Sequence, residues 1–149
     1  MPIPVFRPDG WLPEGHYAAD WKKIGAVFED EPGSRRAELM NRLLQWRDAL
    51  RGKGMGGLLI LNGSFISQKE RPGDVDALFI YDEQSDAIIE ADDEAALLIS
   101  YNYVKPAGIG DIFVFSAIAV REFPAFCNVN IFDRDKMKKM PKGVVEVMV

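Results

Sequence analysis

The sequence contains very little cysteine and histidine. Its 149 residues include one cysteine, Cys127, and one histidine, His16. A single cysteine excludes a disulfide within the chain and a zinc site built from thiolates, so we interpret Cys127 as a small buried apolar residue. A single histidine excludes a histidine-cluster metal site and gives no serine or cysteine hydrolase triad pattern. We therefore expect His16 to be structural.

Long apolar runs and an excess of positive charge are also absent. No run reaches the roughly 18 apolar residues of a membrane span, and the N-terminal segment has prolines and charges where a signal peptide would be apolar. We expect a cytoplasmic protein without membrane attachment. A formal net charge of -5 predicts no bulk DNA binding. One basic stretch would form either a cationic patch or an ordinary solvated face: Arg134, Lys136, Lys138, Lys139 and Lys142.

What is present is sufficient for one folded domain. Apolar residues make up 48% of the chain, which provides a core for a single domain over residues 1–149. Four prolines fall within residues 1–16, and this spacing predicts an extended N-terminal arm.

Apolar spacing predicts two helices in the first third of the chain. Asp20 is suited to cap a short helix that begins at Trp21. Ser34 is suited to cap a longer helix whose buried face carries Leu39, Leu43, Trp46 and Leu50. The glycine-rich stretch 52–57 lacks the Lys-Ser/Thr ending of a P-loop, so we interpret it as the helix end and a connector.

The rest of the chain alternates between apolar runs and polar segments. Strands are predicted at 58–62, at 75–82, at the start of 111–120 and in 142–149. A helix containing Ala95, Leu98 and Ile99 separates the second strand from the third, and Pro106 and Gly108 stop it. Residues 123–140 fit a strand or a helix equally well. This order predicts an α/β (α+β) fold with a mixed β-sheet flanked by helices.

The stretch LNGSFISQKERPGDVDALFIY, residues 61–81, carries the clearest functional pattern. Gly63 and Ser64 follow one strand and offer a tight turn at which main chain can approach an anion. Asp74 and Asp76 begin the next strand, where side chains two residues apart point to the same face. Two adjacent carboxylates are stabilised when a divalent cation, such as Mg²⁺ or Mn²⁺, takes their oxygens as ligands.

Gly63-Ser64, a gap of nine residues and then Asp74-Val75-Asp76-Ala77 resembles the signature of the polymerase-beta-like nucleotidyltransferases. The chain also looks like a small uncharacterised bacterial family of that fold, through MPIP, GHY, NGSF, PGDVD and PKGVV. The resemblance implies a minimal nucleotidyltransferase fold.

The resemblance also implies roles for individual residues. Gly63 and Ser64 would contact the phosphates of an NTP substrate, and Asp74 and Asp76 would bind metal. The family uses three carboxylates. Asp111, which begins the third predicted strand, is our choice for the third, and the alternatives are Glu122 and Asp133.

Two functions remain open at this point. The first is a Mg²⁺- or Mn²⁺-dependent enzyme that transfers a nucleoside monophosphate from an NTP to an unknown acceptor, such as a protein or RNA. The second is a weakly catalytic or non-catalytic nucleotide-binding module, of antitoxin or regulatory type, that acts through a protein partner.

Overall fold

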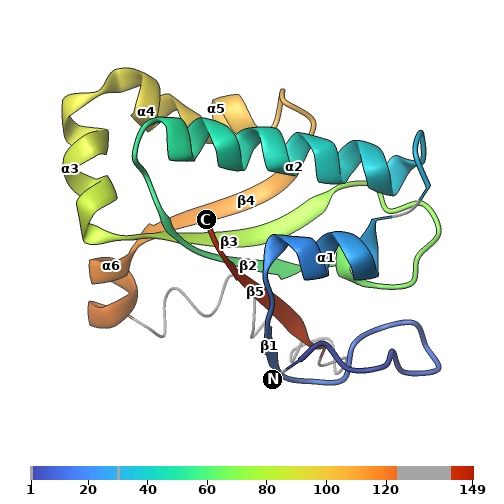
Figure 1. Ribbon diagram of the computed structural model, residues 1–149. Helices are drawn as coiled ribbons and strands as arrows, with labels where there is room; N and C mark the ends of the chain where they lie inside the picture. Colours follow the sequence, from blue (N-terminus) through green and yellow to red (C-terminus); the bar gives the residue numbers. More distant parts are fainter. Residues whose placement is uncertain (1, 30, 124–141) are drawn as a thin grey trace.

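The structure, a computed structural model, describes residues 2–29, 31–123 and 142–149 (Figure 1). Its strands are β1 (His16–Ala18), β2 (Gly57–Asn62), β3 (Val75–Tyr81), β4 (Gly110–Ser116) and β5 (Val144–Met148). Its α-helices are α1 (Trp21–Phe28), α2 (Arg35–Gly52), α3 (Glu83–Ala91), α4 (Asp93–Leu98), α5 (Tyr101–Val104) and α6 (Ala117–Glu122), and a 3₁₀ turn, η1, spans Ser64–Ile66.

The five strands form one mixed sheet in the order β1-β5-β2-β3-β4. β2 pairs antiparallel with both β3 and β5, whereas β4 runs parallel to β3 and β1 runs parallel to β5. The predicted α/β fold with a mixed sheet flanked by helices is therefore confirmed.

Helix α2 supplies much of the core on one face of the sheet. Ser34 caps it, because its hydroxyl oxygen accepts a hydrogen bond from the Ala37 amide at 3.1 Å. The predicted buried face is confirmed: Leu39, Leu43, Trp46 and Leu50 are all buried. The Trp46 ring packs edge-on against Phe79 of β3, with ring centroids 5.4 Å apart, so α2 is held directly on the sheet.

The strands present alternate residues to the two faces of the sheet. Leu59, Leu61 and Phe79 belong to the large core beneath the helices. A second, smaller cluster forms from the intervening positions Ile60, Leu78 and Val144. Asp74, Asp76 and Leu78 are two residues apart along the chain, so their side chains point to the same face of the sheet as the smaller cluster.

The structure corrects several predicted boundaries. The single helix predicted before Pro106 is three short helices, because Asp92 accepts hydrogen bonds from the amides of Glu94 and Ala95 and starts α4. The run 111–120 is a strand at its start, as predicted, and changes to a helix at Ser116, whose hydroxyl caps α6. The N-terminal arm leads into a short strand, β1, that the sequence did not predict.

Within the described part of the chain, no helix combines the length and apolar character needed to cross a membrane. Cys127, the segment 124–140 of uncertain type and the basic residues 134–139 lie outside the described residues. Lys142 is described, and its Nζ atom lies over the Trp11 ring, 3.7 Å from the centroid.

Candidate functional site

Three carboxylates meet where β3 and β4 begin, at the right of the sheet in Figure 1. One oxygen from each of Asp74, Asp76 and Asp111 lies within 4.8 Å of the other two, and all three residues are half-buried. Asp76 and Asp111 face each other in the parallel ladder, and Asp74 is two residues earlier on the same face. The structure thus brings together the three carboxylates chosen from the sequence, which we call the carboxylate trio.

The other candidate residues are placed elsewhere. Glu122 ends helix α6, which follows the opposite end of β4, and it is exposed. Asp133 lies outside the described residues. His16 is in β1, at the other edge of the sheet from β4, and its Nδ1 is 2.7 Å from Glu146 Oε1 on the neighbouring strand. This hydrogen-bond contact joins His16 to the neighbouring strand, away from the trio.

Gly63 makes room for the trio. Its φ of +79° is in the region that favours glycine, and a Cβ placed there would stand 2.4 Å from Asp76 Oδ2. Ser64 follows directly and begins the 3₁₀ turn η1. Asn62, which the sequence analysis did not single out, lies opposite Asp76 in the antiparallel ladder, and its side-chain oxygen is fully buried. The predicted turn is therefore in contact with the predicted carboxylates.

Lys105 adds a positive charge to the site. Its Nζ donates a hydrogen bond to Asp111 Oδ1 at 3.0 Å, and this contact raises the lysine pKa. The charge of Asp74 contributes to the same shift in pKa. Lys105 was not predicted from the sequence, because its approach to Asp111 depends on how the turn after α5 folds back onto β4.

Arg36 fixes the loop that leaves the Gly63 turn. Its side chain is buried, with 7% exposure, although it belongs to the first turn of α2. The guanidinium donates hydrogen bonds to the main-chain carbonyls of Phe28, Ser64, Phe65, Ser67 and Lys69. These bonds tie η1 and the start of the β2–β3 loop to helix α2.

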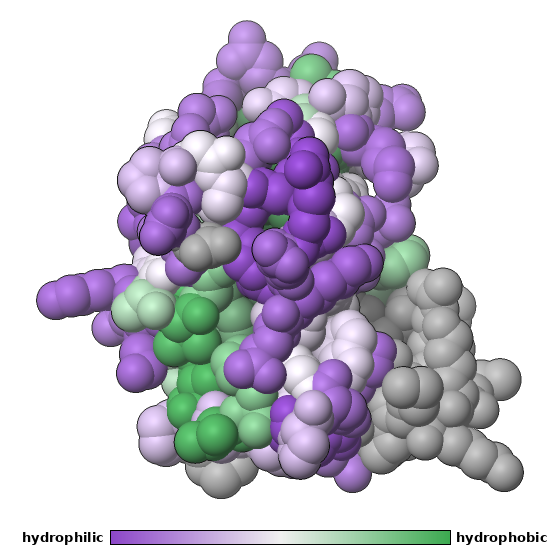
Figure 2. Space-filling view, turned by 90° about the vertical axis from the view of Figure 1, so that its right-hand side faces the viewer, coloured by the Kyte–Doolittle hydropathy of each residue, from purple (hydrophilic) through white to green (hydrophobic). Residues whose placement is uncertain are grey.

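The β2–β3 loop also contacts the N-terminal arm. The Gln68 amide donates to the Gly10 carbonyl at 2.9 Å, and both residues line a cleft of about 350 Å³ with Trp11. Figure 2 views this end of the molecule: hydrophilic residues gather across its middle, and hydrophobic surface gathers below, at the level of the arm in Figure 1. The arm therefore supports the loop that follows Ser64.

A pocket of about 280 Å³ opens beside the trio on the β4 side. Asp111 forms part of its wall, and the remaining lining is apolar or aromatic: Ile99, Tyr101, Ile112, Phe113 and Val114. Tyr101 and Phe113 are exposed, at 64% and 40%. Ring-sized apolar surface is thus available directly next to a carboxylate.

Comparison with known proteins places the chain in a family. The model of DUF6932, a family of unknown function, matches residues 4–148. The chain belongs to this family. No curated protein and no solved structure matches it. DUF6932 membership confirms the expected relationship to a family of unknown function.

Proposed function

We propose that this DUF6932 protein is a metal-dependent nucleotidyltransferase with a minimal nucleotidyltransferase fold, which transfers a nucleoside monophosphate from an NTP to an acceptor. The observation that carries the proposal is the carboxylate trio in contact with the Gly63 turn. The resemblance of this segment to the polymerase-beta-like nucleotidyltransferases supports the same reaction.

The trio fits a hard divalent cation. Its donors are all carboxylate oxygens, the ligand type that Mg²⁺ and Mn²⁺ prefer. The three oxygens lie within 4.8 Å of one another, so they would draw closer to share one cation, whose neighbouring ligand oxygens are about 3 Å apart. A cation bound by Asp74, Asp76 and Asp111 would neutralise charge on the reacting phosphates.

Other residues of the site would handle the phosphates. Gly63 has no side chain, so a phosphate can come close to the main chain between it and Ser64. Lys105 contacts Asp111, on the side of the trio away from Gly63. Its ammonium group would lie near the same phosphates once Asp111 binds a cation.

The arrangement of strands favours one position for the acceptor. Gly63 and Ser64 follow β2, and the 280 Å³ pocket lies beyond β3 on the β4 side. Phosphoryl and nucleotidyl transfer need the attacking and leaving oxygens roughly in line. If the departing pyrophosphate lies at the Gly63 turn, the acceptor approaches from the pocket beside Asp111.

The test is a transfer assay with matched variants. The protein is incubated with each α-³²P-labelled NTP, Mg²⁺ or Mn²⁺, and protein or RNA acceptors. We expect label on an acceptor, and a loss of at least about 100-fold in the transfer rate of Asp76→Asn, because a charged ligand of the cation becomes neutral. Asp48→Asn, at an exposed position of α2, is the control. Absence of transfer together with absence of Mn²⁺ binding by calorimetry would overturn the proposal.

One observation favours the alternative of a nucleotide-binding module that acts through a partner. In the described residues, five of the seven exposed large apolar side chains lie between positions 97 and 123: Leu97, Tyr101, Phe113, Ile118 and Phe123. Tyr101 and Phe113 line the same pocket, and contiguous exposed apolar surface is typical of an interaction site. A module of this kind would bind NTP without turnover and co-purify with a stoichiometric protein from its host.

A further inference from the structure

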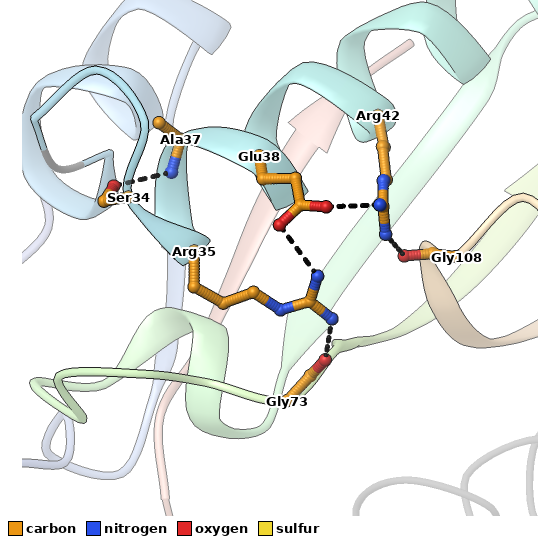
Figure 3. A network of polar contacts seen from close by, with 7 residues as sticks. All are labelled: Ser34, Arg35, Ala37, Glu38, Arg42, Gly73 and Gly108. Carbon is orange, nitrogen blue, oxygen red and sulfur yellow. Dashed lines mark hydrogen bonds and ion pairs between the residues drawn. The ribbon is translucent and has the colours of Figure 1, made fainter.

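Glu38 joins two arginines on the exposed side of helix α2 (Figure 3). Its Oε2 accepts a hydrogen bond from Arg35 Nη1 at 3.1 Å, and its Oε1 accepts one from Arg42 Nη2. The three residues are spaced at i, i+3 and i+7, so they lie along one side of the helix. Contacts with the two arginines, Arg35 first, lower the pKa of Glu38, so the carboxylate stays charged to a lower pH than a free glutamate does.

The outer ends of the two arginines reach the loops that precede β3 and β4. Arg35 Nη2 donates to the Gly73 carbonyl at 2.5 Å, and Arg42 Nη1 donates to the Gly108 carbonyl at 2.9 Å. Gly73 immediately precedes Asp74, and Gly108 lies three residues before Asp111. One continuous chain of hydrogen bonds therefore connects the two segments that carry the carboxylate trio.

The contact at Gly108 depends on the absence of a side chain. Its φ is +73°, and a Cβ at this position would stand 2.4 Å from Arg42 Nη1. Any other residue would push the guanidinium away from the carbonyl. The glycine at this position therefore allows Arg42 to reach the Gly108 carbonyl.

Solvent exposure argues against a mainly stabilising role for this chain of contacts. The Glu38 side chain is 47% exposed, and exposed ion pairs contribute little to folding. The chain of hydrogen bonds has a different consequence, because it ends at the main-chain carbonyls of Gly73 and Gly108, which lie close to the carboxylate trio. We propose that Glu38 is a positioning residue: through Arg35 and Arg42 it sets the spacing between the Asp74–Asp76 segment and Asp111. The consequence for cation affinity rests on the function proposed above.

The test uses Glu38→Gln, because the amide group keeps the shape of the side chain but turns an NH₂ donor toward one of the arginines. We expect Mn²⁺ affinity, measured by calorimetry, to fall about 10-fold, the lower end of the range for outer-shell changes at metal sites. Glu38→Asp, which keeps the charge, should recover part of the affinity. Asp48→Asn removes the partner of Arg47 on the same helix, away from both loops, and should leave the affinity unchanged.

A second readout requires no metal. The Val75 amide donates to the Ile109 carbonyl at 2.9 Å, so its hydrogen exchange reports on the contact between the two segments. We expect at least tenfold faster exchange at Val75 in Glu38→Gln and in Gly108→Ala, with β5 amides unchanged. Unchanged exchange at Val75 in both variants would overturn the positioning role. Faster exchange in a protein that neither transfers label nor binds Mn²⁺ would instead retain that role and overturn the proposed function.

Discussion

Gly63 leaves the space that the Asp76 carboxylate of the trio occupies. A methyl group at this position would collide with the Asp76 carboxylate, and the backbone conformation is itself unfavourable for a residue with a side chain. We predict that Gly63→Ala reduces Mn²⁺ affinity more than tenfold and destabilises the fold by about 1–3 kcal/mol. Calorimetric titration and urea unfolding measure the two effects separately.

Gly33→Ala is the matched control for this prediction. Gly33 has a φ of +87°, close to that of Gly63, but no atom lies within 4 Å of the Cβ that would be added. It should therefore show the conformational cost alone, with Mn²⁺ affinity unchanged. Equal Mn²⁺ affinity in the two glycine variants would mean that the space beside Asp76 is unimportant for the site.

The residues of the site differ in how far the sequence determines their placement. Asp74 and Asp76 are two positions apart on one strand, so their convergence follows from strand geometry. Asp111 joins them only because β4 pairs with β3 in one parallel register. The sequence suggests that the two strands are neighbours but does not determine this register. Lys105 contacts Asp111 across a loop, and Glu38 is linked to the loop at Gly73 through Arg35. Nothing local in the sequence marks such contacts.

At the scale of elements, predictions succeeded where the signals were local. Ser34 and the spacing of four apolar residues defined α2 because a cap and one buried face suffice for a helix. The short strand β1 was missed because its three residues are a strand only through pairing with β5, more than 120 positions away. The third apolar run was correctly predicted as a strand at its start, but the helix that follows was not predicted, although Ser116 caps it.

Helix α2 contacts the loops that carry the site, and Arg36 is the buried arginine among these contacts. Replacing Arg36 with Met keeps apolar volume but leaves buried carbonyls of the β2–β3 loop without these donors. We predict a loss of about 3 kcal/mol in the free energy of unfolding, measured by urea denaturation, because several acceptors lose their partner together. Proteolysis within residues 64–71 should accelerate as well, since this loop would open locally.

Arg51→Met tests whether the effect is specific to Arg36. Arg51 is an exposed residue in the last turn of the same helix, so its replacement should change the free energy of unfolding by no more than about 0.5 kcal/mol. Similar losses in both variants would show that arginine content of the helix, rather than the carbonyl contacts, determines its stability.

For the whole molecule, exposed ion pairs predict a fall in stability at acid pH. The pKa values of Asp9, Glu38 and Asp92 are all lowered by hydrogen bonds to basic side chains, namely Arg7, Arg35 and Lys53. A lowered pKa means that the folded chain binds these protons more weakly than the unfolded chain does. The stabilisation is therefore complete above the ordinary values of 3.8 and 4.5, and it is lost as pH falls through the lowered ones.

We accordingly expect the urea midpoint to change little between pH 7 and about 5, and to decrease steadily below pH 4.5. Each contact is solvent-exposed and weak, so the decrease reflects their combined effect. Glu38→Gln should show a shallower decrease than the wild-type chain, because it has no carboxylate to protonate at this position. A wild-type midpoint that stayed constant or rose from pH 5 to pH 3 would contradict this account, since the folded chain would then bind the protons at least as strongly as the unfolded one.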